Sequence, residues 1–370
     1  MKVLCVFGTR PEAIKMAPVV KELRKHADCI STVVCVTAQH REMLDQVLSL
    51  FGIEPDYDLN IMQENQSLAN LTALALTRLD AVLEQEQPDW ILVQGDTTTA
   101  MVAALAAFYR RIRVGHVEAG LRSRNKFHPF PEEINRKLVG NLCDLHFAPT
   151  ETARQNLLRE GVDDSNITVT GNTVIDALLD FTARPYDWEA GPLAHIPRQA
   201  RLILVTAHRR ENFGPPLKNT CAALKEIAFR YPDAHLIYPV HLNPGVRRTV
   251  NDQLNYIRNI SLLEPLEYLH FVHLLKHSYL VLTDSGGLQE EAPVLGKPVL
   301  VLREVTERPE GVAAGTVKVV GTDQRRIVQE TVRLMEDKIE YQRMARAISP
   351  YGDGKASARI LARLMASPRI

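Results

Sequence analysis

The chain has 370 residues, of which 45% are hydrophobic and 24% charged, and its 44 Lys and Arg residues are balanced by 44 Asp and Glu residues. This length suits about two domains with full hydrophobic cores. The balanced charge excludes a general electrostatic attraction to nucleic acid or to an anionic membrane surface.

Short apolar runs alternate with helical patterns along the chain. In the first half the runs predict strands at 3–7, 32–36, 90–93, 114–117, 145–148 and 167–169. In the second half they predict strands at 202–205, 236–240, 260–263, 280–282, 299–302 and 317–320. Helical periodicity is clear at 17–25, 43–51 and 68–83. Strands that are apolar on both faces are typical of parallel sheets covered by helices on both sides.

Two groups of strands separated by an aperiodic stretch predict two doubly wound, Rossmann-like α/β domains. We place the linker at 171–201, the first domain at 1–170 and the second at 171–354. A last amphipathic helix within 355–370 is expected to rejoin the first domain. Its predicted apolar face carries Ile360, Leu361, Leu364 and Met365.

The amino-terminal apolar run is too short for the core of a signal peptide and has no cleavage site, so it predicts a strand. No stretch of the sequence approaches the roughly 20 apolar residues of a membrane span. The five cysteines are scattered and form no C-x-x-C pair. We therefore expect free thiols and a cytoplasmic protein that does not enter the membrane.

Ligands of open parallel sheets bind beyond the carboxyl ends of the strands, so the residues that follow each strand are the candidates for a site. After the first strand, GTRPEAIK places Arg10 and Lys15 near the N-terminus of a helix, which attracts anions. The alternative is a capped helix with two solvated cations. The segment is neither G-x-G-x-x-G nor a Walker loop, so no dinucleotide or nucleoside triphosphate is indicated.

A second candidate phosphate site follows the strand at 280–282, in the segment TDSGGLQEE. Gly286 and Gly287 let backbone N–H groups approach a phosphate closely, and Ser285 is expected to cap the next helix and to donate its hydroxyl. Glu291 lies far enough from these residues to accept hydrogen bonds from ribose hydroxyls. The alternative is a plain Gly-rich turn between a strand and a helix.

Three carboxylates are candidates for acid/base chemistry. Asp96 and Glu118 each follow a strand, and Glu132 lies in the first turn of a helix, where an acid can also simply complement the helix dipole. His208 follows the first strand of the second domain and is expected to donate to a phosphate or to act as an acid, although a lone His is often structural. The spaced histidines 270, 273 and 277 lack an H-E-x-x-H motif, so we expect a structural helix and no metal.

These motifs together resemble the bacterial non-hydrolysing UDP-N-acetylglucosamine 2-epimerases. The matching segments occur in order over nearly the whole chain. They are FGTRPEAIKMA at 7–17, TAQHREMLDQV at 37–47, GDTTT at 95–99, GHVEAGLR at 115–122, PEEINR at 131–136, TGNTVIDA at 170–177, TAHRREN at 206–212, YPVHLNP at 238–244, TDSGGLQEEAP at 283–293, TERPEG at 306–311 and PYGDG at 350–354.

The resemblance implies the GT-B fold, in which two Rossmann-like domains face across a cleft that holds UDP, and it implies a homodimer. It also implies the reversible conversion of UDP-GlcNAc to UDP-ManNAc for cell-surface polysaccharide biosynthesis, without NAD, metal or another cofactor. The C2 proton has no carbonyl next to it, so the family eliminates UDP to give a 2-acetamidoglucal and then adds UDP back.

The same resemblance assigns roles to residues. Arg10, Lys15 and the Ser285–Gly287 turn stabilise the departing UDP, and His208 lies near the diphosphate. Asp96, Glu118 and Glu132 provide acid and base groups at C2. The other residues expected in the substrate site are Arg136, Arg308, Phe271 near uracil and Glu291 on the ribose.

Some bacterial members bind a second UDP-GlcNAc as an allosteric activator. Gln39, Arg209 and His241 match that site, but Glu42 and Asn65 stand where those members have a Gln and an Arg. The loss of a phosphate-pairing Arg and the gain of a carboxylate predict binding weaker by roughly 1–3 kcal/mol.

Three alternatives remain open at this stage. A hydrolysing 2-epimerase would release UDP and free ManNAc, a GT-B glycosyltransferase would need an acceptor, and a catalytically silent UDP-sugar sensor would show no turnover.

Overall fold

The computed structural model describes residues 1–37, 41–61, 66–209 and 212–367. The chain divides into two compact units. Unit 1 contains Met1–Ala177 and Tyr351–Ile370, and unit 2 contains Leu178–Pro350. Each unit is built around one parallel sheet, which confirms the predicted class of two parallel-sheet α/β domains.

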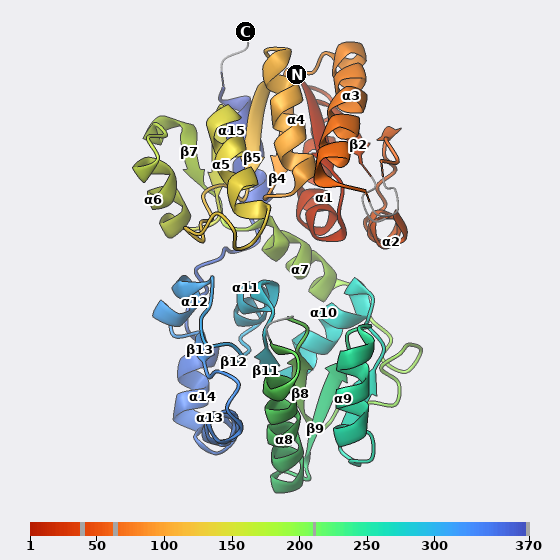
Figure 1. The fold of residues 1–370 in the computed structure, drawn as a ribbon, viewed down its shortest axis with the longest axis vertical. Coiled ribbons are helices and arrows are strands. Elements are labelled where there is room, and N and C mark those ends of the chain that lie inside the picture. The colour runs from red at the N-terminus through yellow and green to blue at the C-terminus, as the bar shows by residue number, and fades with distance from the viewer. Residues whose placement is uncertain (38–40, 62–65, 210–211, 368–370) are drawn as a thin grey trace. The chain divides into compact units, whose positions relative to one another are not determined.

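The sheet of unit 1 has the order β3-β2-β1-β4-β5-β6-β7 (Figure 1). Six of these strands coincide with the predicted runs. The bounds are β1 (Lys2–Phe7), β2 (Ser31–Val36), β3 (Tyr57–Asp58), β4 (Trp90–Gln94), β5 (Arg113–Val117), β6 (Leu145–Ala148) and β7 (Ile167–Val169). The sequence analysis missed β3, because two residues are too few to show a pattern and only their pairing with β2 defines the strand.

The helices of unit 1 cover both faces of its sheet. Figure 1 shows α3, α4 and α5 over the face nearer the viewer, and α1 packs against α2 and α15. Their bounds are α1 (Arg10–Arg24), α2 (Arg41–Phe51), α3 (Leu68–Glu86), α4 (Thr98–Tyr109), α5 (Glu132–Leu142), α6 (Glu151–Arg159), α7 (Thr173–Ala183) and α15 (Ala356–Met365). The boundary between the units falls within α7, because Ala177 belongs to unit 1 and Leu178 to unit 2.

Two helices of unit 1 can be compared closely with the sequence prediction. Helix α1 begins at Arg10, in agreement with the helix N-terminus predicted near Arg10 and Lys15, and Thr9 and Glu12 form a capping box at its start. Helix α15 buries Ile360, Leu361 and Leu364, but Met365 at its last turn is 52% exposed and does not belong to the buried face.

Unit 2 has the strand order β10-β9-β8-β11-β12-β13, with all pairs parallel. All six strands match predicted runs. Their bounds are β8 (Arg201–Thr206), β9 (Ala234–Pro239), β10 (Ile260–Leu263), β11 (Ser278–Thr283), β12 (Val299–Val301) and β13 (Val317–Val319). The helices are α8 (Pro215–Arg230), α9 (Pro244–Leu254), α10 (Tyr268–His277), α11 (Gly286–Val294), α12 (Pro309–Ala313), α13 (Gln324–Glu336) and α14 (Lys338–Ala345).

The strand order fixes where a ligand can bind in each unit. In unit 1 the direction of winding reverses between β1 and β4, and in unit 2 it reverses between β8 and β11. At such a point the loops after the two central strands diverge to opposite faces and leave an opening at the carboxyl edge of the sheet. Within the described part of the chain, no helix has the length and hydrophobicity of a membrane-spanning segment.

Candidate active site

The loop after β1 packs closely against the loop after β4, at the switch point of unit 1. A Cβ atom added to Gly8 would lie 2.0 Å from the hydroxyl of Thr37 and 2.7 Å from that of Thr99, so only glycine fits there. Glu12 accepts the N–H of Thr9 at 2.7 Å and the hydroxyl of Thr97 at 2.6 Å. The carboxylate of Glu12 therefore joins the loop after β1 to the loop after β4.

Glu12 was not singled out from the sequence, although the T-x-x-E capping box was a usable signal. Its side chain is buried, and burial raises its pKa in spite of the hydrogen bonds from Thr97, Thr9 and Gly8 that oppose the shift. Arg10, by contrast, lies exposed on the first turn of α1.

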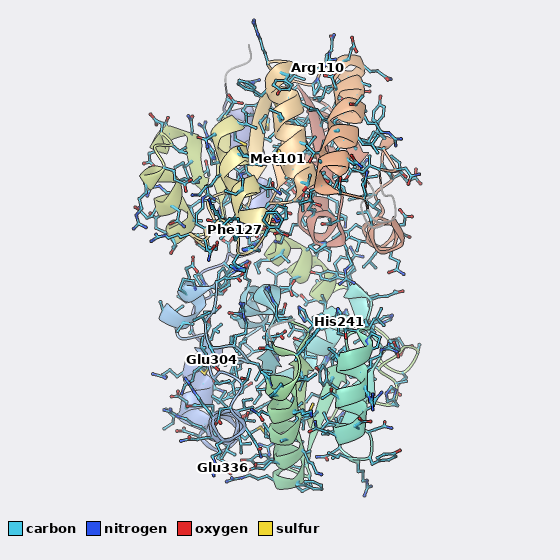
Figure 2. The ribbon with its side chains drawn as sticks, in the orientation of Figure 1. Met101, Arg110, Phe127, His241, Glu304 and Glu336 are labelled. Carbon is cyan, nitrogen blue, oxygen red and sulfur yellow. The ribbon has the colours of Figure 1, made fainter. Side chains whose placement is uncertain are left out.

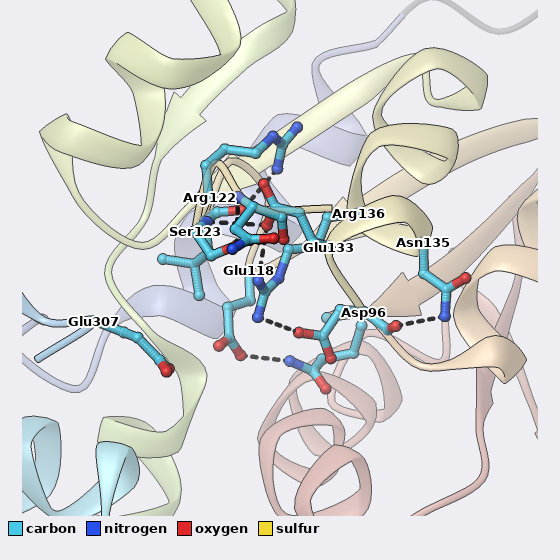
Figure 3. Close-up of polar contacts among 12 residues, drawn as sticks. Asp96, Glu118, Arg122, Ser123, Glu133, Asn135, Arg136 and Glu307 are labelled. Atoms are coloured by element: carbon cyan, nitrogen blue, oxygen red, sulfur yellow. Dashed lines mark hydrogen bonds and ion pairs between the residues drawn. The ribbon is translucent and has the colours of Figure 1, made fainter. Parts of the chain in front are cut away.

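Asp96 follows β4 and is held through both its backbone and its side chain. Arg136 pairs with its carboxylate at 2.5 Å, and the side-chain amide of Asn135 donates to its carbonyl at 2.9 Å (Figure 3). The preceding residue, Gly95, has a φ of +69°, and its carbonyl lies 2.7 Å from Nε2 of the buried His116. Burial lowers the pKa of His116 to about 3, so its imidazole is neutral and donates to this carbonyl.

Glu118 follows β5 in a conformation that side chains seldom adopt. Its φ is +66°, a left-handed value that costs about 1–2 kcal/mol for a residue other than glycine. The carboxylate is buried, accepts the amide of Gln94 at 2.5 Å and forms an ion pair with Lys15. The backbone of Glu118 is strained, and the surrounding contacts hold it in place. Such strain is often found at functional residues.

Glu132 and Glu133 begin α5 and differ in what they contact. Glu133 is fully buried and accepts the N–H groups of Ser123 and Arg124 at 2.9 and 3.0 Å. One carboxylate oxygen of Glu132 is buried and has no hydrogen-bond partner among the described residues. Because a buried polar atom without a partner costs free energy, Glu132 is the better candidate to meet a ligand.

In unit 2, the turn after β11 consists of Asp284 and of the segment that begins at Ser285, and the two differ in their contacts. Asp284 is fully buried and accepts the N–H groups of His208 at 2.9 Å and Arg209 at 2.8 Å and the side-chain amide of Asn212 at 3.0 Å. Its carboxylate therefore organises the loop after β8. The Ser285–Gly287 segment, for which the sequence predicts a phosphate site, begins at the next residue.

Ser285 is the N-cap residue of α11, and Gly286 and Gly287 are the first two helical residues. The hydroxyl of Ser285 makes no capping hydrogen bond, unlike the expectation from the sequence. A Cβ atom on Gly286 would lie 3.7 Å from the guanidinium of Arg209, and Nε of Arg209 is buried without a hydrogen-bond partner in the described chain. The first N–H groups of α11, this hydroxyl and this guanidinium together form a site for an anion.

His208 lies beside this anion site, with its side chain 40% exposed and its Nδ1 3.4 Å from Asp284. Burial lowers its pKa, with Arg209 and His241 acting in the same direction and Asp284 against it. The ring of His241 lies 6.1 Å from that of His208, centre to centre, on the exposed loop before α9 (Figure 2). A neutral His208 can accept a proton or donate one hydrogen bond to a phosphate oxygen.

The remaining predicted substrate residues of unit 2 lie on α10, α11 and the loop before α12. Arg308 pairs with Glu290 of α11, and its N–H donates to Thr306, whose hydroxyl in turn contacts Gln289. Glu291 is buried on α11, and Phe271 is half-buried on α10. Gln289, Glu290 and Thr306 were not singled out from the sequence, and only their contacts show that they hold Arg308 in place.

The three histidines of α10 each meet a residue of the linker. His273 stacks on Tyr186 with ring centres 4.4 Å apart, His270 lies 2.9 Å from the Tyr186 hydroxyl, and His277 lies 2.9 Å from Arg198. Their role is to bind the linker to α10. Among the described residues the donors near enough to share a metal ion are instead His26, Asp28 and Cys29.

The proposed allosteric residues are described only in part. Gln39 and Asn65 lie outside the described residues, as does the side chain of Glu42. Arg209 and His241 both lie beside His208 in unit 2.

Comparison with known proteins shows the family to which the chain belongs. The family model described as UDP-N-acetylglucosamine 2-epimerase matches residues 21–365. The chain belongs to the UDP-N-acetylglucosamine 2-epimerase family. It is 57% identical to the UDP-N-acetylglucosamine 2-epimerase of Escherichia coli K12 over 367 residues, which are 98% of this chain and 97% of that protein.

Solved structures place the fold within the same group. The UDP-GlcNAc 2-epimerase of Neisseria meningitidis, bound to UDP-GlcNAc, is 52% identical and superposes with a TM-score of 0.90 over 99% of this chain and 100% of that one. The glycosyltransferase of kitacinnamycin, at 15% identity, superposes with a TM-score of 0.63 over 98% of this chain and 99% of its own. Because this last likeness concerns the fold alone, it supports the GT-B-like architecture predicted for this epimerase-family chain.

Proposed function

We propose that this chain interconverts UDP-GlcNAc and UDP-ManNAc by eliminating UDP and adding it back, without hydrolysis and without a cofactor. The observation that carries the proposal is the set of three acidic side chains in unit 1. Asp96 follows β4 at the switch point and pairs with Arg136, Glu118 follows the neighbouring β5 and pairs with Lys15, and Glu132 has a buried oxygen without a partner among the described residues. The family membership and the UDP-GlcNAc in the Neisseria meningitidis structure support the identity of the substrate.

The reaction needs a base, an acid and a stabilised leaving group. A carboxylate takes the proton from C2 while the C1–O bond to the β-phosphate breaks, and the electron pair of the C–H bond forms the C1=C2 bond of the glycal. A carboxylic acid then delivers a proton to the opposite face of C2, and a β-phosphate oxygen re-forms the bond to C1. We assign these proton transfers to Asp96, Glu118 and Glu132, and their division between the two faces stays open.

We assign the diphosphate to cationic and N–H donors. Lys15 and Arg10 on α1 and the Ser285–Gly287 turn stabilise the charge that develops on UDP as it leaves. His208 has a lowered pKa, so it is neutral at pH 7 and donates one hydrogen bond to a phosphate oxygen. We further propose that Arg136 and Arg308 contact the substrate, that Phe271 lies on the uracil and that Glu291 binds the ribose.

The deciding experiment is incubation of the protein with UDP-GlcNAc in deuterated water, followed by NMR. We expect deuterium at C2 in both UDP-GlcNAc and UDP-ManNAc, with UDP still attached. Accumulation of free ManNAc and UDP would show a hydrolysing epimerase instead. Turnover that begins only when an acceptor is added would show a glycosyltransferase, and the absence of any exchange would leave a UDP-sugar sensor.

We also propose that the chain forms a homodimer through the outer face of α4 and α5. Large apolar side chains are exposed there, namely Phe108, Tyr109, Ile134 and Leu138, and α4 packs beside α5. The mass in solution, measured by light scattering, should be twice that of one chain, and Leu138→Glu should reduce it to one chain. A wild-type mass of a single chain would contradict the proposal. A cytoplasmic location stays a prediction, supported by the free state of all five cysteines.

A further inference from the structure

Glu133 lies at the start of α5, behind the carboxylates proposed for catalysis. Its two oxygens accept the N–H groups of Ser123 and Arg124, in the loop that connects β5 to α5. The φ of Arg124 is +62°, so this short segment needs the two hydrogen bonds to hold its conformation. Burial alone would raise the pKa of Glu133, but the two N–H groups and Arg136 outweigh it and hold the pKa below its ordinary value.

Arg136 connects Glu133 to Asp96. One guanidinium nitrogen lies 3.1 Å from Glu133 and another lies 2.5 Å from Asp96, and Figure 3 shows the guanidinium between the two carboxylates. Because the guanidinium is planar and its donors have a fixed geometry, an anchor on one edge fixes the direction of the other edge. The Arg136 side chain is only 14% exposed, so water does little to loosen this arrangement.

We propose that Glu133 is a positioning residue for the C2 proton transfer, which acts through Arg136 to fix the orientation and the charge balance of Asp96. This inference rests on the proposed epimerase function. The side chain of Glu133 is buried, and its oxygens contact Ser123, Arg124 and Arg136, so its contacts are with the protein. Asn135, two residues further along α5, donates to the carbonyl of Asp96, so α5 holds both the backbone and the side chain of this residue.

Other charged groups surround this chain of contacts. Glu133 lines a pocket of about 390 Å³, and the other charged residues that line it are Arg122, Arg124, Lys137, Arg159 and Glu160. On the side of Asp96, Lys15 and Glu118 form their own ion pair, and Arg136 helps to lower the pKa of the neutral His116. All of these groups are unchanged when Glu133 alone is replaced, so a shift in the pH profile can be assigned to Glu133.

The test is Glu133→Gln, with kcat measured against pH by C2 deuterium exchange. Glutamine removes the negative charge that shares Arg136 with Asp96, so the guanidinium loses its anchor and acts on Asp96 alone. We expect kcat to fall by roughly 10- to 100-fold, the affinity for UDP to change less than threefold, and the acidic limb of the pH profile to move to lower pH. A purely structural role would lower the unfolding temperature without moving that limb.

Two further variants complete the test. Glu133→Asp keeps the charge but cannot reach all three donors, so kcat should fall while the limb stays in place; if Glu133→Gln does not fold, an unchanged kcat in Glu133→Asp overturns the inference. Glu160→Gln removes a carboxylate of the same pocket that pairs with Arg122 at 2.7 Å, and it should leave the profile unchanged.

The two proposals can fail separately. A wild-type protein that shows no C2 exchange from UDP-GlcNAc would refute the proposed function. A wild-type protein that exchanges normally, together with a folded Glu133→Gln variant of unaltered kcat and pH profile, would refute only the role of Glu133.

Discussion

The ammonium group of Lys15 forms an ion pair with the carboxylate of Glu118, which joins α1 to the loop after β5. The family resemblance implies different roles for the two residues, Lys15 at the diphosphate and Glu118 at the sugar. Because one ammonium group cannot fully neutralise two anions, a diphosphate bound to Lys15 competes with Glu118. In the proposed reaction this contact couples the binding and departure of UDP to the charge around a candidate base.

Replacement of Lys15 tests this coupling. Lys15→Gln removes the cation that pairs with Glu118 and that we propose stabilises the leaving UDP, so kcat/KM for C2 exchange should fall by about 10²- to 10³-fold. The matched control is Lys25→Gln just after the same helix, where Lys25 forms an exposed pair with Glu22 at 2.7 Å. That variant should match the wild type, and a Lys15→Gln variant with more than half of the wild-type activity would contradict the assignment.

The buried carboxylate of Asp284 predicts a large effect on stability. Asp284→Asn keeps the shape but turns an N–H group toward the donors of His208, Arg209 and Asn212. We expect the free energy of unfolding to fall by about 2–3 kcal/mol in urea denaturation and UDP binding to weaken, because the loop after β8 loses its anchor.

The control for Asp284 is an exposed carboxylate of the same unit. Asp233 pairs with Arg201 at 2.9 Å on the surface, so Asp233→Asn should change stability by no more than about 0.5 kcal/mol. Equal effects of the two variants would show that Asp284 is not a structural anchor.

Replacement of Ser285 should affect UDP binding but not the stability of the fold. Its hydroxyl makes no capping hydrogen bond, so Ser285→Ala should alter the free energy of unfolding by less than about 0.5 kcal/mol. If the hydroxyl binds a phosphate oxygen, the affinity for UDP measured by calorimetry should fall about tenfold. Thr150→Ala provides the comparison, because Thr150 caps α6 at 3.2 Å and its loss should cost about 1 kcal/mol. Destabilisation by Ser285→Ala with unchanged UDP affinity would reverse this assignment.

Two buried histidines predict loss of stability in acid. Burial lowers the pKa of His116 to about 3 and that of His146 to about 4. The unfolded chain takes up protons below its ordinary His pKa of about 6.5, whereas the folded chain stays neutral at these sites until pH 4 to 3. Stability should therefore be unaffected above pH 7 and decrease as pH falls from 6.5, by about 2 kcal/mol per histidine at pH 5.

The measurement is the free energy of unfolding between pH 7.5 and 4.5. His146→Gln should reduce the slope of stability against pH, and His128→Gln, at an exposed position, should not. An identical slope in the wild type and in His146→Gln would contradict the prediction.

Much of the fold was predictable because the strands are buried on both faces. Continuous apolar runs located twelve of the strands, and the exception, Tyr57–Asp58, is defined only by its pairing with β2. The exposure of Met365 was less accessible, because local contacts in the last turn of a helix decide which side chains are buried there.

The sequence by itself determined the two-sheet architecture, the family and the segments that carry Asp96, Glu118, Glu132 and the Ser285 turn. It could do so because hydrophobic periodicity and short motifs are local properties of the chain. Only the tertiary structure decided which polar side chains pair with each other through hydrogen bonds and ion pairs. It paired Lys15 with Glu118, surrounded Asp284 with donors from the loop after β8 and gave Glu132 and its neighbour Glu133 different contacts, since hydrogen bonds and ion pairs between distant segments exist only after the sheets have formed.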